Sequence, residues 1–314
     1  MPYALVLHCF AADGRMQPDD LQGQKTLALF LQELVQKQDA AIATRLHAPH
    51  NPKPFTTALL TPPQPRRRLP RRGKPVRVQD PRGDARAPHE VKIRITLLDD
   101  ALYPLVLQFF LQHLEGTPVL RLGQTPLIVS RVLVTPESGE PWAGCARFAD
   151  LLAAASETET AWTVHFATPT AFKAGDAELP LPIPRLCFQS WLQSWDAYAP
   201  FPFFAEQNAR KAFLAEVVEA QVSITYAQLR GAHQPLYFDG SRTHVCGFVG
   251  TCRFAVRPGR TSPASRKLLA TLVRYSYYAG TGRKTTMGMG LTKPLEEEAP
   301  CRRMPVSATT RTTC

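Results

Sequence analysis

The chain has 314 residues, 44% of them hydrophobic, and this length and composition exclude a disordered protein and suit two domains with separate cores. Its 37 lysines and arginines outnumber 26 acidic residues, and the formal net charge of +11 favours a polyanionic partner, nucleic acid before an anionic membrane. We expect no membrane partner, because the longest apolar runs, such as residues 101–114, are shorter than the ~20 residues of a membrane span. Residues 3–12 also lack the basic leader of a signal peptide.

The seven cysteines are scattered along the chain and include no Cys-x-x-Cys pair. Cys246 and Cys252 have no histidine or cysteine partner at the spacing of a zinc site. We therefore expect reduced thiols in a cytoplasmic protein, with neither a structural metal nor a cofactor.

The first half of the chain carries the apolar patterns of four strands and two helices. Leu27, Leu31 and Leu34 recur on one helix face, and residues 91–98 alternate apolar and polar side chains as a half-exposed strand does. The predicted strands are residues 3–10, 53–60, 91–98 and 127–134, and the predicted helices are residues 18–36 and 102–114. This β-α-β-β-α-β order is that of a ferredoxin-like domain, which we assign to residues 1–140.

A strongly basic segment separates the second and third predicted strands. Residues 64–94 contain eleven basic residues against three acidic ones, a net charge of +8. Their proline and glycine content predicts an irregular or partly disordered insertion, residues 61–89, and not another element. A charge run can be no more than a solvated face, but this density favours contact with RNA. The arginines expected to make that contact are Arg66, Arg67, Arg68, Arg71 and Arg72.

The second half roughly repeats the order of the first, after a junction at residues 136–159. Strand patterns start at residue 162 and recur at 222–226, 245–256 and 289–291, and helix patterns occupy 184–195, 206–219 and 265–278. We predict a second ferredoxin-like domain over residues 158–293, followed by a mobile tail over residues 294–314. The predicted fold class is therefore α+β, with two such domains in tandem.

A glycine-rich loop near the carboxyl end, residues 280–290, holds two Gly-x-Gly pairs around a basic tip. It is not a dinucleotide fingerprint, because Thr285 replaces the third glycine, nor a Walker loop, because Arg283 stands where a Walker glycine belongs. We expect its backbone amides to be exposed and to cradle phosphate oxygens beside the two cations. The residues predicted to bind RNA are Gly280, Gly282, Arg283, Lys284, Gly288 and Gly290.

The catalytic chemistry open to this sequence is metal-independent. The acidic residues form no converging set for a metal-dependent nuclease, since Asp99 and Asp100 stand at a predicted helix start and 296–298 lie in the tail. RNA cleavage without a metal needs a group that takes the 2′-hydroxyl proton, and a neutral histidine can do so. His47 stands out because it falls in a proline-punctuated segment predicted to be a loop, where catalytic groups are common. His50 is a competitor for the same role.

Three segments resemble the repeat-associated RNA-binding (RAMP) superfamily of CRISPR systems. The glycine-rich loop keeps that superfamily's Gly-x-Gly, five residues, Gly-x-Gly spacing, with Thr281 and Met289 between the glycines. Residues 46–56, Leu-His-x5-Lys-Pro-Phe-Thr, resemble the active-site segment of its CRISPR repeat-processing endoribonucleases. The turn at residues 168–172, Thr-Pro-Thr-x-Phe, is similar to that family as well.

This resemblance implies an endoribonuclease that cuts CRISPR repeat RNA, the precursor of guide RNA. By it, His47 acts in general acid–base catalysis and Lys53 stabilises phosphate charge. The 2′-hydroxyl then attacks the adjacent phosphorus and leaves a 2′,3′-cyclic phosphate and a 5′-hydroxyl. The resemblance also implies that the two domains lie side by side and that the repeat binds in the cleft between them.

The chain departs from the family pattern at one position. Some members place a tyrosine one helix length before the histidine, and the matching region near Gln32 has none. A third catalytic side chain is therefore open among Lys25, Arg45 and His50. Two other functions stay open as well: a non-catalytic RNA-binding subunit of a CRISPR effector complex, and a basic DNA-binding protein.

Overall fold

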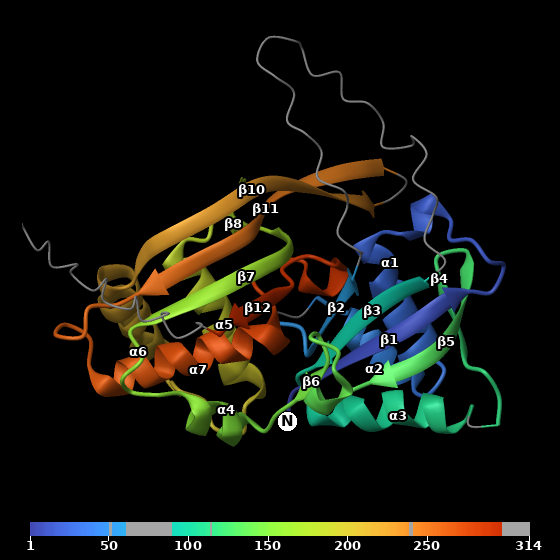
Figure 1. Ribbon diagram of the computed structural model, residues 1–314, viewed down its shortest axis with the longest axis horizontal. Helices are drawn as coiled ribbons and strands as arrows, with labels where there is room; N and C mark the ends of the chain where they lie inside the picture. Colours follow the sequence, from blue (N-terminus) through green and yellow to red (C-terminus); the bar gives the residue numbers. More distant parts are fainter. Residues whose placement is uncertain (50–51, 61–89, 114, 239–240, 297–314) are drawn as a thin grey trace, which may run out of the picture.

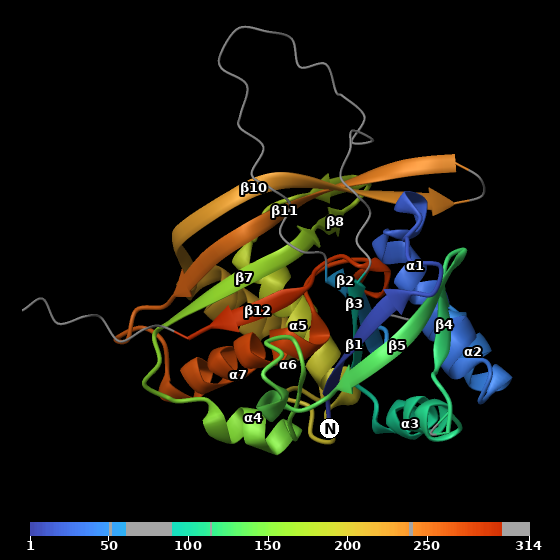
Figure 2. The ribbon, with the colours of Figure 1, turned by 45° about the vertical axis from the view of Figure 1, so that its right-hand side comes forward.

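The computed structural model describes residues 1–49, 52–60, 90–113, 115–238 and 241–296 (Figure 1). Two antiparallel sheets lie side by side, one from each half of the chain, and each is covered by its own helices (Figures 1 and 2). Within the described ranges, no helix combines the length and apolar character needed to cross a membrane.

The N-terminal sheet has the strand order β2-β3-β1-β5-β4, with β6 also pairing with β1. Its apolar core joins the sheet to the helices and includes Leu7, Phe30, Ile95 and Phe109. The strands are β1 Tyr3–Ala11, β2 Phe55–Leu60, β3 Glu90–Leu97, β4 Val119–Leu122, β5 Thr125–Leu133 and β6 Gly144–Cys145. The helices are α1 Gly23–Ala28 with a π-helical continuation Leu29–Val35, α2 Ala40–His47 and α3 Tyr103–Leu111.

The predicted strands and helices of this half are confirmed, and the structure adds three elements that the pattern missed: β4, β6 and α2. Helix α2 begins at Asp39, whose side chain accepts a hydrogen bond from the Ile42 amide at 2.9 Å, and it buries Ala43 and Leu46. The prediction of a loop around His47 is therefore wrong at its start, since His47 is the last residue of α2. The Asp39 cap was a readable helix signal in the sequence.

The C-terminal sheet has the order β10-β11-β7-β12, the same topology as β2-β3-β1-β5 in the first. The α+β tandem of ferredoxin-like domains is thus confirmed. The strands are β7 Ala161–Thr170, β8 Phe172–Ala174, β9 Ala177–Leu179, β10 Ser223–Phe238, β11 Ser241–Ala255 and β12 Thr292–Leu295. The helices are α4 Phe148–Ala154, α5 Pro184–Tyr198, α6 Gln207–Ala212 with a π-helical continuation Phe213–Glu219, and α7 Pro263–Ala279.

Two strand predictions in this half need correction. The last strand is β12, at residues 292–295, whereas the predicted residues 289–291 belong to the end of the glycine-rich loop. The short strand predicted at 222–226 is the start of a 16-residue strand, β10, which with β11 forms a long hairpin. The domain limits 1–140 and 158–293 stay a prediction, and the expected tail is described only as far as residue 296.

The β10–β11 hairpin extends across the top of the molecule toward α1 (Figures 1 and 2). Its buried Leu236 and Val245 pack with Ala171 and with Met289 of the glycine-rich loop in a small apolar cluster. The hairpin and the loop therefore support one another above the boundary between the two sheets.

Polar side chains of β3 fasten the two halves together. Arg94 is 1% exposed, and its Nε donates to the Trp142 carbonyl oxygen at 2.9 Å while its Nη2 donates to that of Tyr277 at 2.6 Å. Its guanidinium also lies over the Tyr277 ring, 4.5 Å from the centroid. The Thr96 hydroxyl donates to the Tyr278 carbonyl oxygen at 2.9 Å. These contacts fix the last turn of α7, where the glycine-rich loop begins.

Candidate functional site

The glycine-rich loop lies against the N-terminal half of the chain, close to the segment that carries His47. The Thr57 hydroxyl donates to the Thr286 carbonyl oxygen at 2.8 Å, and the Gly288 amide donates to the Thr57 carbonyl oxygen at 3.0 Å. Thr57 belongs to β2, which begins two residues after Lys53. The fold therefore brings the two predicted motifs together, although more than two hundred residues separate them in the sequence.

Two backbone segments approach so closely at Gly288 that this position requires glycine. Its φ is +85°, and a Cβ at this position would lie 2.5 Å from the Cα of Gly23 in α1. A Cβ on Gly23 would in turn lie 2.7 Å from the Cα of Gly288. Only glycine at both positions lets the loop and α1 pack this tightly.

The amides of the loop glycines are not exposed, and this corrects the expectation of an open phosphate cradle. Gly280 donates to the Ser276 carbonyl oxygen at 2.9 Å, and Gly290 donates to that of Pro169 at 3.0 Å. Gly282 donates to the Ser190 hydroxyl at 3.0 Å, and Gly288 donates to Thr57. The glycines instead supply left-handed backbone and close packing, because all four have φ between +67° and +85°.

Four cations line a pocket of about 440 Å³ beside the loop: Lys53, Lys173, Arg283 and Lys284. Burial lowers the pKa of Lys53. Burial also lowers the pKa of Lys284, with a further contribution from the charge of Arg283, while Glu178 acts in the opposite direction. Arg283 Nη1 pairs with Glu178 Oε1 at 2.7 Å. A pocket of this charge and size suits phosphate oxygens.

A groove of about 970 Å³, which we call the His47 groove, runs between the α1 segment and α2. His47 lines it from the last turn of α2, with its side chain exposed, and Lys25 lines it from α1. Met287 of the glycine-rich loop lines both this groove and the cationic pocket. The imidazole and the four cations therefore lie in adjoining hollows.

Lys53 lines the cationic pocket and also binds the helix end that carries His47. Its Nζ donates to the carbonyl oxygens of Leu46 at 2.7 Å and Ala48 at 2.5 Å, the residues on either side of His47. A cation at the last carbonyls of a helix satisfies them and favours the negative end of the helix dipole. Lys53 therefore fixes the turn that presents His47 while it also lines the cationic pocket.

The candidates for a third catalytic group are not equally placed. Lys25 lines the groove with His47, whereas Arg45 is an exposed residue of α2 outside the groove lining. The other predicted site residues lie outside the described residues: His50, Arg66, Arg67, Arg68, Arg71 and Arg72.

Sequence reasoning missed Lys173 and Ser190 as members of the site. Lys173 lies in β8, just after residues 168–172, whose Thr-Pro-Thr part is the end of β7 and not a turn. Ser190 lies on α5, where its hydroxyl accepts a hydrogen bond from the Gly282 amide. The segment before Lys173 resembles the family, so the place of Lys173 near the loop was open to prediction. The convergence of Lys173 and Ser190 on Lys53 depends on the packing of the two domains, which no local pattern reveals.

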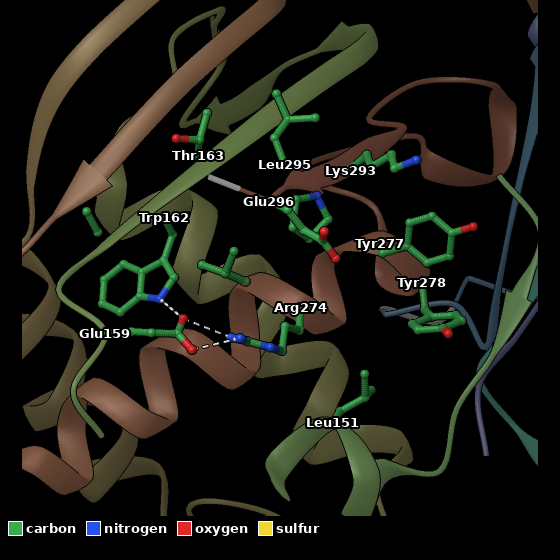
Figure 3. Close-up of a pocket in the computed structure, with 13 residues that line it drawn as sticks. Leu151, Glu159, Trp162, Thr163, Arg274, Tyr277, Tyr278, Lys293, Leu295 and Glu296 are labelled. Carbon is green, nitrogen blue, oxygen red and sulfur yellow. Dashed lines mark hydrogen bonds and ion pairs between the residues drawn. The ribbon is translucent and has the colours of Figure 1, made fainter. Parts of the chain in front are cut away.

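A separate pocket of about 650 Å³ lies between α4, α7, β7 and β12 (Figure 3). It holds an ion pair in which Arg274 Nη2 meets Glu159 Oε1 at 2.7 Å, and the Trp162 indole N–H donates to Glu159 Oε2 at 2.9 Å. Burial opposes ionisation of Glu159, but hydrogen bonds from Arg274 and from the Ser156 amide outweigh it and lower the pKa. None of the described site residues predicted from sequence lines this pocket.

Comparison with known proteins gives matches to one family over both halves. Residues 164–292 match the family model described as CRISPR-associated endoribonuclease Cas6, and residues 1–153 match that of the CRISPR Cas6 N-terminal domain. A CRISPR-associated endoribonuclease Cas6 of Mycobacterium tuberculosis (strain CDC 1551 / Oshkosh) is 32% identical over 158 residues, 50% of this chain and 46% of that protein. One of Streptococcus thermophilus is 30% identical over 141 residues, 45% of this chain and 53% of that protein. The matched stretches thus span about half the length of these curated relatives.

Solved structures match over nearly the whole chain. A Cas6 product complex is 26% identical with a TM-score of 0.70, and the match covers 94% of this chain and 100% of that one. Thermus thermophilus Cas6 is 24% identical with a TM-score of 0.64, over 94% of this chain and 98% of that one. With both halves matched by the family's models and the tandem fold matched by its structures, the chain belongs to the Cas6 family of CRISPR-associated endoribonucleases.

Proposed function

We propose that this protein is a metal-independent endoribonuclease that cuts CRISPR repeat RNA into guide RNAs. The observation that carries the proposal is the adjacency of the His47 groove to the cationic pocket, with Met287 lining both. A strand of RNA whose backbone lies along the cations passes the imidazole at this junction. The family membership and the net charge of +11 support the same substrate.

In the proposed reaction His47 takes the proton of a 2′-hydroxyl, and that oxygen attacks the adjacent phosphorus. The bond to the 5′-oxygen breaks, and Lys25 gives that oxygen a proton. The products are a 2′,3′-cyclic phosphate and a 5′-hydroxyl. Lys53 offsets the negative charge that grows on the phosphate oxygens and holds the turn that carries His47. Lys25 takes the third role because it shares the groove with the imidazole, which Arg45 does not.

RNA binding extends from this site in the proposal. Lys173, Arg283 and Lys284 contact backbone phosphates in the cationic pocket, and the glycines Gly280, Gly282, Gly288 and Gly290 give the loop the shape that presents these cations. The arginines of the basic insertion bind phosphates farther along the strand. Stable membership of an effector complex and a cytoplasmic location stay predictions.

The test is a cleavage assay on the repeat RNA in EDTA, with a matched RNA that carries a 2′-deoxy nucleotide immediately 5′ of the cut. We expect the all-ribose RNA to give a fragment ending in a cyclic phosphate, and the 2′-deoxy RNA to be bound but uncut. An all-ribose RNA that is shifted in a gel yet stays intact would instead indicate a non-catalytic RNA-binding subunit. Competition by duplex DNA would indicate a DNA-binding protein.

A further inference from the structure

The groove beside His47 combines an apolar floor with an amide rim. Leu27, Leu31 and Met287 give the floor its apolar surface. Gln32 and Gln36 line it with exposed side chains. Each glutamine amide offers two N–H donors and a carbonyl acceptor. The groove therefore presents both hydrogen-bond polarities above a surface that gains from burial.

The groove exists because small residues stand where two packed helices would otherwise fill the space. Ala28 of α1 and Ala40 and Ala43 of α2 all line it, and no side chain at these positions extends beyond a methyl group. Gln32 and Gln36 are one helical turn apart on the π-helical segment and just beyond it, so their amides follow the same edge. The resulting hollow of about 970 Å³ is far larger than a His47 side chain requires.

We propose that this groove binds one unpaired nucleobase of the RNA, next to the phosphate that is cut, and so helps to set where cleavage occurs. The inference rests on the proposed function. When phosphates occupy the cationic pocket and a 2′-hydroxyl lies at His47, the base next to the cut phosphate lies at the mouth of the groove. The base plane lies on the apolar floor, and the amides of Gln32 and Gln36 hydrogen-bond its edge, as proteins commonly read single-stranded RNA.

Binding measurements on uncut RNA test the groove independently of catalysis. The ligands are the repeat RNA with a 2′-deoxy nucleotide at the cut, and three versions in which one nucleotide near the cut is also abasic. The proteins are wild type, the double variant Gln32→Ala with Gln36→Ala, and the control Gln38→Ala. Gln38 lies outside the groove lining, and its Nε2 donates to Gln112 Oε1 at 2.9 Å on the surface.

We expect the double variant to bind the intact RNA roughly three- to tenfold more weakly for each hydrogen bond removed, and the control to bind as wild type does. On the RNA that lacks the bound base, wild type and the double variant should bind equally, because the partner of the amides is gone. The groove proposal would be overturned if the double variant bound the intact RNA as tightly as wild type does. It would also be overturned if the double variant bound all three abasic RNAs more weakly than wild type by the same factor. If wild type binds repeat RNA but never cuts the all-ribose form, the proposed function fails while the groove result still stands.

Discussion

At the scale of single residues, the central feature is that Lys53 holds the helix turn that presents His47. Its ammonium group donates to the carbonyl oxygens of Leu46 and Ala48, so the imidazole sits on a fixed helix end. A catalytic group held by packing and hydrogen bonds loses little freedom when the substrate binds. The same ammonium lines the cationic pocket, so one side chain serves both position and charge.

The lowered pKa of Lys53 predicts that the cleavage rate falls at a lower alkaline pH than it would with an exposed lysine. Burial favours the neutral amine, so Lys53 gives up its proton at a lower pH than an exposed lysine does. The charge proposed to stabilise the phosphate is present below that pKa and is lost as pH rises through it. In Lys53→Arg the guanidinium stays charged, so the alkaline decline should move to higher pH, even if the maximum rate falls. Single-turnover rates across pH on the repeat RNA measure this, and an unchanged alkaline decline in the arginine variant would count against a charge role for Lys53.

At the scale of elements, the glycine-rich loop packs against both halves of the chain. Its turn rests on α1 and β2, and its Met289 packs below the β10–β11 hairpin. The loop therefore positions Arg283 and Lys284 by contacts on both sides. Its paired-glycine spacing therefore has a packing reason.

Gly288→Ala should destabilise the protein more than a matched glycine substitution elsewhere. Gly139 has nearly the same backbone, φ +73°, but a Cβ there meets nothing within 4 Å. Gly139→Ala should cost about 1 kcal/mol of unfolding free energy from left-handed backbone strain alone. Gly288→Ala should cost about 2 kcal/mol more, because its Cβ collides with Gly23. Urea unfolding of both variants makes the comparison, and equal losses would show that the close approach carries no energy.

Most elements of this fold can be predicted from the sequence because the buried face of a long helix or strand gives a regular apolar pattern. The β-α-β-β-α-β order, the helix at α7 and the strand at β3 all follow from such patterns. Helix α2 is short and ends among prolines, so its period was hidden, and only the Asp39 cap marked it. The glycine amides were misjudged because their partners, such as Ser190 and Pro169, lie far away in the sequence. Hydrogen bonds of that kind are set by tertiary packing within the C-terminal half and leave no local signal.

At the scale of the whole molecule, a buried cation joins the two domains. Arg94 of β3 binds carbonyl oxygens of Trp142 and Tyr277 and is 1% exposed. Arg94→Met keeps the bulk of the side chain but leaves both acceptors without this donor. We expect a loss of about 2–5 kcal/mol in unfolding free energy. The control Arg147→Met, which breaks an exposed pair with Asp150, should leave the urea midpoint nearly unchanged. Similar midpoints for the two variants would mean that Arg94 does not hold the domains together.

Net charge makes a separate prediction about affinity for RNA. Replacing Arg66, Arg67, Arg68, Arg71 and Arg72 with glutamine keeps the length of the insertion and removes five positive charges. If these arginines neutralise backbone phosphates, the slope of log affinity against log salt should become shallower by roughly 0.7 for each phosphate of single-stranded RNA that the variant no longer neutralises. Binding isotherms at several salt concentrations give the slope. An unchanged slope would mean that these side chains face solvent in the complex.

The most direct test of the account is the single-turnover cleavage rate of His47→Ala on the repeat RNA, measured beside its affinity for the same RNA. Loss of a general acid–base group should slow cleavage by ~10²–10⁴-fold, with affinity close to that of wild type because the cationic pocket is intact. Cleavage at the wild-type rate, with the same cyclic-phosphate end, would contradict the central claim that His47 takes the 2′-hydroxyl proton.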